Sequence, residues 1–149
     1  MFKTVVVPID GSKHAMKAAV AAIDLAAKYR STLHFIVVTK RPTPRVSENV
    51  RRYMEIEHML GTPEDVVAEM AQEVLRQATH HAGKKGLSRV KSVVLSGHPA
   101  REIVDFAKRA KADLIVMGSR GLGDIKGFML GSVSHKVSSL AGCPCLVVR

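Results

Sequence analysis

Residues 113–121, Asp-Leu-Ile-Val-Met-Gly-Ser-Arg-Gly, carry an apolar run straight into a glycine-rich segment that closes with Gly131-Ser132. Two residues separate Gly118 from Gly121, and nine separate Gly121 from Gly131. The apolar run predicts a buried strand, and the helical spacing that follows Gly131 predicts a helix. Glycines allow positive φ and close backbone approach to a ligand, while loop amides and a helix N-terminus attract anions. The stretch therefore predicts a phosphate-binding loop between a strand and a helix.

Counting the spacings excludes two familiar phosphate loops. The chain has no run of Gly, four residues, Gly, Lys and Ser or Thr, which a Walker A loop requires. Gly121, Gly123 and Gly127 come close to the dinucleotide fingerprint, but their second gap is three residues instead of two. The loop is therefore a different way of holding phosphate.

The alternation of strand and helix extends outward from this loop over the whole chain. Apolar runs predict strands at 3–8, 32–39, 89–96, 113–117 and 144–149. Apolar residues at helical spacing predict helices at 13–30, 62–81, 97–110 and 132–140. Such alternation predicts the α/β class: one domain over 1–149, with an open five-stranded parallel sheet and helices on both faces.

Local signals fix two of the helix starts. Ser12 is a natural N-cap, and Thr62 is followed by proline and two acidic residues, as at many helix N-termini. The segment 40–61, with Pro42 and Pro44, is expected to be irregular, with a helical part around 54–59.

The composition limits which classes of partner the chain could bind. Its 149 residues are 46% hydrophobic, which suits one packed domain. The net charge of +10 permits an acidic partner, but two Tyr, four Phe and no Trp offer few platforms for single-stranded bases. No apolar run reaches the ~18 residues of a membrane span, and the first residues are typical of a strand instead of a signal peptide. We therefore expect a cytoplasmic protein with no membrane partner.

Side chains that could carry catalysis or metal binding form no recognised pattern. The seven histidines lack metal-ligand spacing, and no nucleophile elbow is present. Cys143 and Cys145 flank Pro144 without the spacing of a redox pair, so we expect two buried thiols. No catalytic residue is assigned, and whether the chain is an enzyme stays open.

Two predicted loops can line one crevice. Asp10-Gly-Ser12 follows the first strand and the glycine loop follows the fourth, and ligands of open parallel sheets bind beyond the carboxyl ends of strands. Val38, at the end of the second strand, can flank a flat base. Asp10 either contacts the ligand or only bonds the start of the first helix, and Ser132 can cap its helix as well as contact phosphate.

Three stretches of the chain resemble the universal stress protein family: VVVPIDGS at 5–12, GHPAREIVDFAKRAKADLIVMGSRG at 97–121 and LGSVSHKVSSLAGCPCLVVR at 130–149. The glycine spacing is similar to that of the family's ATP-binding branch. The resemblance implies a Rossmann-like sheet with strand order 3-2-1-4-5 and ATP lying across strands one and four. It also implies a homodimer that pairs the last strands, here 145–149.

The resemblance further implies roles for single residues. Asp10 is expected to contact the ribose and phosphates directly or through Mg²⁺, and Val38 to contact the adenine. The remaining expected nucleotide contacts line the cleft or hold the phosphates: Met117, Gly118, Gly121, Gly131, Ser132 and Val133. As cations beside the loop, Arg120 and Lys126 are further candidates for phosphate contact.

Three functions follow from these expectations. The first is an ATP-binding universal stress protein, with a nucleotide-dependent regulatory role in a stress response and an unknown protein partner. The second is a slow Mg²⁺-dependent ATPase built on the same site. The third is a basic nucleic-acid-binding module driven by the net charge of +10.

Overall fold

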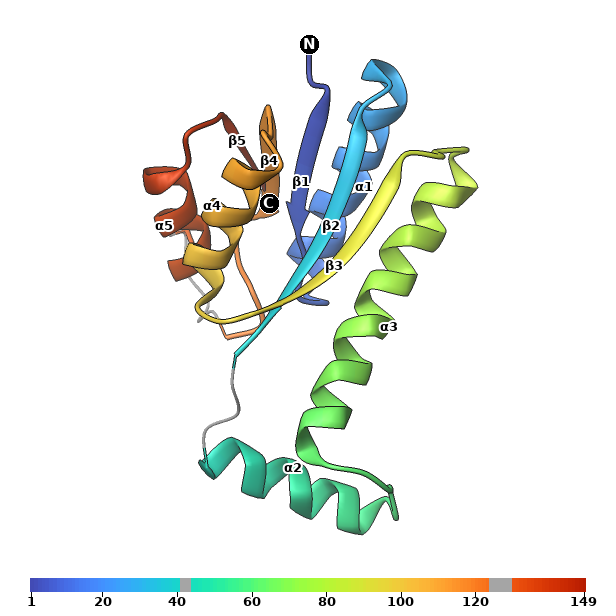
Figure 1. The fold of residues 1–149 in the computed structure, drawn as a ribbon, viewed down its shortest axis with the longest axis vertical. Coiled ribbons are helices and arrows are strands. Elements are labelled where there is room, and N and C mark those ends of the chain that lie inside the picture. Colours follow the sequence, from blue (N-terminus) through green and yellow to red (C-terminus); the bar gives the residue numbers. More distant parts are fainter. Residues whose placement is uncertain (41–43, 124–129) are drawn as a thin grey trace.

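A five-stranded parallel sheet forms the centre of the molecule, with strand order β3-β2-β1-β4-β5 (Figure 1). The computed structural model describes residues 1–40, 44–123 and 130–149. The strands are β1 (Thr4–Pro8), β2 (Thr32–Thr39), β3 (Val90–Ser96), β4 (Leu114–Gly118) and β5 (Cys145–Val148). The predicted order and direction of the strands are confirmed, and each strand begins and ends within two residues of its predicted bounds.

Helices cover both faces of the sheet, so the central strands are buried on both sides. Val5, Val6 and Val7 of β1 are completely shielded from solvent, as expected of a parallel strand between two helical layers. One core contains side chains of α1 (Lys13–Tyr29) and α3 (Pro63–Lys84). The other contains side chains of α4 (Pro99–Arg109) and α5 (Ser132–Leu140).

The two predicted helix caps are confirmed. The Ser12 hydroxyl accepts a hydrogen bond of 3.2 Å from the Ala15 N–H, where α1 begins. Thr62 and Asp65 bond each other's backbone N–H reciprocally at the start of α3. Each pair satisfies amide groups that the first helical turn leaves without partners.

The segment expected to be irregular contains a helix, α2 (Pro44–Ile56), that is longer than predicted and ends three residues earlier. Val46, Val50 and Met54 recur every four residues, which is a helical signal. The prolines obscured it, although proline is tolerated in the first helical turn. The helix packs against α3 below the sheet in Figure 1.

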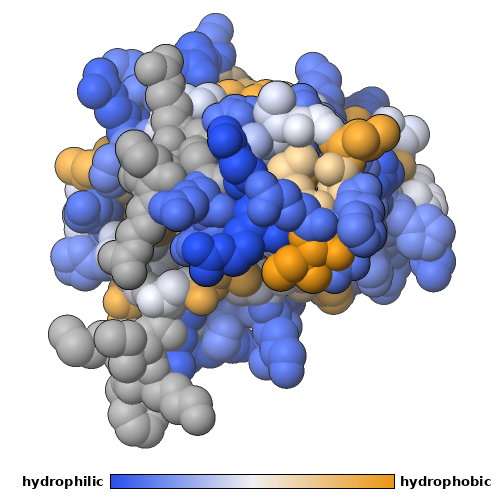
Figure 2. All heavy atoms as spheres, turned by 90° about the horizontal axis from the view of Figure 1, so that it is seen from below, coloured by the Kyte–Doolittle hydropathy of each residue, from blue (hydrophilic) through white to orange (hydrophobic). Residues whose placement is uncertain are grey.

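The carboxyl ends of β1 and β4 lie side by side, because Val5 and Val6 pair with Leu114 and Ile115. The loops that follow these two strands therefore open at the same end of the sheet. Figure 2 views the molecule from that end and shows a hydrophobic area among mostly hydrophilic side chains. Among the helices of the described residues, none has the length and apolarity to cross a membrane.

Candidate functional site

A cavity of about 590 Å³ opens beyond the carboxyl ends of β1, β2 and β4, a size typical of small-molecule sites. The lining residues come from six elements and the loops between them. They are Pro8, Ile9, Asp10, Ala15, Val38, Lys40, Pro99, Ile103, Met117, Gly118, Arg120, Gly121, Leu122, Gly123, Ser132, Val133 and Ser134. All of the expected contact residues except Gly131 are therefore part of one cavity.

One part of the cavity is apolar. Val38 is the last residue but one of β2, and Met117, only 3% exposed, is part of the core between the sheet and α4. Pro99 and Ile103 of α4 complete this wall and were not predicted from sequence. Their position could have been inferred, because the helix after β3 begins at the same end of a parallel sheet. The wall offers a surface for a flat, apolar ring.

Asp10 connects the loops on the two sides of the cavity. Its Oδ1 accepts a hydrogen bond of 2.9 Å from the Ser12 N–H, at the start of α1. Its Oδ2 accepts one of 3.1 Å from the Leu122 N–H, in the glycine loop. The carboxylate thus bonds the start of the first helix, which was one of the two roles expected for Asp10. It also holds the glycine loop against β1.

The glycine loop is closed at its base by buried hydrogen bonds. The Gly131 N–H donates to the Ser119 carbonyl over 2.7 Å. The Ser134 hydroxyl lies 3.1 Å from the same carbonyl and 2.9 Å from the Gly131 carbonyl. Ser119 and Ser134 are 5% and 4% exposed, so water competes little for these bonds. The bonds fix the start of α5 relative to the end of β4.

The glycines at the two ends of the loop, Gly118 and Gly131, do not have positive φ. The described glycines with positive φ are Gly11, Gly61, Gly86 and Gly97. At Gly118, a Cβ atom would lie 2.7 Å from the carbonyl carbon of His14 and 2.8 Å from the nitrogen of Ala15, so this glycine allows β4 to approach the backbone of α1.

The start of α5 faces the cavity and has no side-chain cap. Gly131 is the N-cap, with φ −61° and ψ 156°, and Ser132 is the first helical residue. The expectation that Ser132 caps the helix is therefore wrong by one position. A glycine cap has no side-chain oxygen to accept from the first-turn amides, so the helix end remains suited to an anion.

Charged groups of both signs reach the cavity. Lys40 and Arg120 line it together with Asp10, which places Arg120 where a phosphate contact was expected. Lys126 lies outside the described residues. No group of three or more metal-ligating side chains occurs in the described part of the chain. Asp10 offers a single carboxylate, which suits a Mg²⁺ ion held mainly by phosphate oxygens.

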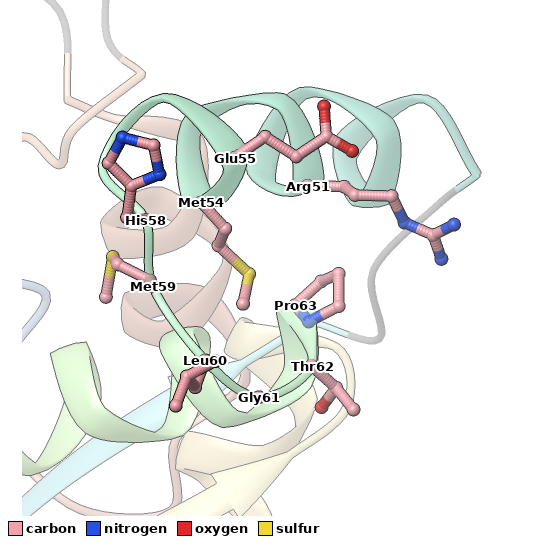
Figure 3. Close-up of a pocket in the computed structure, with 9 residues that line it drawn as sticks. All are labelled: Arg51, Met54, Glu55, His58, Met59, Leu60, Gly61, Thr62 and Pro63. Atoms are coloured by element: carbon pink, nitrogen blue, oxygen red, sulfur yellow. The ribbon is translucent and has the colours of Figure 1, made fainter.

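A second cavity, of about 620 Å³, lies between α2 and the start of α3 (Figure 3). The side chains of Met54, Met59 and Pro63 line it together with Arg51 and His58. All its lining residues come from one continuous stretch, 51–63, and none was expected to bind a ligand. The cavity at the strand ends is instead lined by segments that are distant in sequence. It has an apolar wall and few polar groups, which is typical of small-molecule sites.

The two thiols differ from expectation in their exposure. Cys143 and Cys145 are free and only half-buried, because β5 is an edge strand with one side uncovered. Burial of the thiols raises the pKa of each above its ordinary value, so both stay protonated and unreactive at neutral pH.

Comparison with known proteins gives a consistent result. Residues 1–149 match the Universal stress protein family. Universal stress protein YxiE of Bacillus subtilis is 37% identical, with both chains covered completely. The structure of UspA from Lactobacillus plantarum superposes with a TM-score of 0.80 at 24% identity, covering 99% of this chain and 97% of that one. The structure of a universal stress protein in complex with cAMP has a TM-score of 0.71 at 28% identity, with 99% and 97% coverage. The chain therefore belongs to the universal stress protein family.

Proposed function

We propose that this protein binds ATP in the cavity at the strand ends and that nucleotide occupancy regulates its activity in a stress response. The observation that carries the proposal is the gathering of the expected contact residues around one cavity with an apolar wall and an uncapped helix start. The relative in complex with cAMP supports an adenine nucleotide as the ligand.

The cavity suggests how the nucleotide lies. The adenine packs against Val38 and Met117, since the wall between β2, β4 and α4 is apolar. The phosphates lie toward Gly121 and the first turn of α5, where amides and the helix dipole favour negative charge. Asp10 faces the ribose and phosphates, and Mg²⁺ is held by phosphate oxygens with Asp10 as a protein ligand.

The hydrogen bonds of Asp10 favour ATP binding over ATP hydrolysis as the role of the site. It is the one carboxylate among the described lining residues, and both of its oxygens already accept backbone hydrogen bonds. With both oxygens directed at these amides, Asp10 is poorly positioned to accept a proton from an attacking water. Single-turnover measurements with radiolabelled ATP test the alternative, a slow ATPase. Hydrolysis that disappears in Asp10→Asn would establish it.

We also propose that the protein forms a homodimer through β5. β5 is the last strand of the sheet, so one side of its backbone is available to pair with a second copy. Antiparallel pairing of two β5 strands joins the sheets of two protomers into one.

Titration calorimetry with ATP and Mg²⁺ tests the nucleotide site through Gly131→Val. The backbone of Gly131 has an ordinary negative φ, so valine fits its conformation and the variant is expected to fold. Gly131 itself does not line the cavity, but Ser132 and Val133 directly after it do, so we expect the added side chain to displace the first turn of α5 from the phosphates and to weaken binding at least tenfold. Gly142→Val is the control, because a Cβ there meets no atom within 4 Å. Equal affinity in folded Gly131→Val and wild type would overturn the proposal.

A further inference from the structure

Ten exposed basic residues gather at the end of the sheet opposite the cavity, where strands begin and helices end. We name this surface the amino edge. It comprises Lys3, Lys28, Arg30, Lys84, Lys85, Arg89, Lys91, Lys108, Arg109 and Lys111. In Figure 1 it is the top of the molecule, where β1, β2 and β3 begin and α1 and α3 end.

Backbone hydrogen bonds place the strand ends of this surface side by side. The Thr32 N–H donates to the Lys3 carbonyl over 2.7 Å, and the Leu33 N–H donates to the Arg89 carbonyl over 2.8 Å. The Arg89 guanidinium lies 3.5 Å from the Arg30 carbonyl. Lys3, Arg30 and Arg89 therefore lie on directly neighbouring segments of this surface.

Acidic side chains do little to neutralise the amino edge. Of its ten cations, only Lys85 has an ion pair with a described residue, 3.0 Å from Asp24. Asp113 accepts hydrogen bonds of 2.8 Å from the Lys3 and Thr4 amides. Seven of the 13 acidic residues of the chain instead lie between residues 44 and 85.

Helix ends explain some of these cations and not others. Basic side chains near the carbonyl end of a helix interact favourably with its dipole, which accounts for Lys28, Lys84 and Lys108. Lys3, Arg89 and Lys91 lie at or just before the starts of strands, which have little dipole. These three require another explanation.

Backbone conformation supplies an independent observation at the same surface. Arg30 and Lys111 follow the ends of α1 and α4 with φ of 55° and 50°, in the left-handed region. Glycine is the usual residue at such a position, because it has no Cβ. Basic side chains thus occupy two sites where glycine would suit the backbone better.

We propose that the amino edge binds the phosphodiester backbone of double-stranded nucleic acid. Rows of unpaired Lys and Arg are the usual partners of closely spaced phosphates. Phe2 and Tyr29 pack edge to face with ring centres 5.5 Å apart, and Lys28 lies 5.8 Å from the Tyr29 ring centre. Phe106, 6.0 Å from Arg109, packs against the His34 ring. Each of these rings is engaged with a neighbouring ring and so is poorly placed to stack on single-stranded bases or enter a bilayer. The site is separate from the nucleotide cavity and does not depend on it.

The test measures binding of 20-base-pair duplex DNA and duplex RNA by fluorescence anisotropy over a salt series. The variant is Arg30→Gly/Lys111→Gly, which removes two charges and relaxes two left-handed positions. We expect it to be at least as stable as wild type to heat, since glycine favours these backbones. At about 100 mM salt its affinity for duplex should fall roughly 10- to 100-fold, and the slope of log K against log salt by about 2.

The control removes the same charge elsewhere: Lys17→Gln/Lys136→Gln, on exposed faces of α1 and α5. This control should retain wild-type duplex affinity to within a few fold. Three results overturn the proposal: no duplex binding by wild type at low salt, equal losses in both double variants, or tighter binding to single strands or to anionic phospholipid vesicles. Displacement of duplex by ATP would also overturn it, by placing the duplex at the cavity. ATP affinity of the glycine variant reports on the proposed function separately.

Discussion

Gly118 holds β4 against α1 at a distance that leaves no room for a methyl group. The nearest atoms to its missing Cβ belong to the helix backbone, which cannot rotate away as a flexible side chain could. The Gly118→Ala variant is therefore expected to lose about 1–3 kcal/mol of unfolding free energy, the usual cost of overpacking. Urea denaturation of the purified protein measures the loss.

Gly142→Ala is the matched control for Gly118→Ala. A Cβ at Gly142 meets no atom within 4 Å, so its stability should stay within about 0.5 kcal/mol of wild type. Equal stability of Gly118→Ala and wild type would mean that β4 and α1 can separate without cost.

Sequence patterns predicted some residue roles at the site and missed others for a physical reason. The caps at Ser12 and Thr62 depend on local bonds within four residues, so their signals are local too. The bond between Asp10 and Leu122 joins residues 112 positions apart, and no pattern in one sequence reveals it. Gly118 was expected at the cavity, but its closeness to α1 exists only after the sheet has formed.

At the scale of elements, β5 carries the prediction about assembly. The Pro144 and Val148 carbonyls accept bonds from Ile115 of β4 and from Ser119 just after it, so the two-residue period of a strand turns the Val147 N–H toward the open edge. Val147→Pro removes that donor and leaves the bonds to β4 intact. We expect a shift from dimer to monomer in light scattering coupled to size-exclusion chromatography.

Circular dichroism of Val147→Pro checks that the sheet survives the change. A folded variant that remains dimeric would show that β5 is not the interface. A wild-type protein that is monomeric at all concentrations would remove the dimer proposal altogether.

The strands were predicted closely and α2 was not, and the difference lies in burial. The central strands are buried on both faces, which demands continuous apolar runs that a sequence displays plainly. α2 lies away from the sheet, and among its residues with described side chains only Met54 is buried. A helix that buries so little needs few apolar residues, so its helical periodicity is weak. The two nearby prolines, which indicate an irregular segment, then outweigh it.

At the scale of the whole molecule, His34 couples folding to pH. It lies on β2 beside Lys91 of β3, with its ring 5.7 Å from that of Phe106, and its buried Nδ1 has no hydrogen-bond partner among the described residues. Arg109 lies 6.0 Å from the centre of the Phe106 ring. Burial, and secondarily the charge of Lys91, lowers the pKa of His34 below its ordinary value of 6.5. The folded state therefore binds this proton less readily than the unfolded chain does. Its contribution to stability is complete above pH 6.5 and is lost as the pH falls below that value.

Urea denaturation at about pH 7.5 and about pH 5.5 measures this coupling. Wild type should be less stable at the lower pH, and His34→Leu should lose part of that difference because it has no proton to bind. An identical pH dependence in the two proteins would assign the effect to other groups.

The buried clasp formed by Ser119, Gly131 and Ser134 has a consequence for protein engineering. Because the two ends of the glycine loop are tied to each other, we expect the sheet and helices to keep their arrangement when residues are added after Gly123, beyond the bond between Leu122 and Asp10. Doubling the length of a loop costs only about 0.6 kcal/mol in closure entropy. The loop between the tied ends is thus a suitable insertion point. A foreign peptide or reporter module can be grafted there, beside the cavity, while the strands of the sheet keep their register.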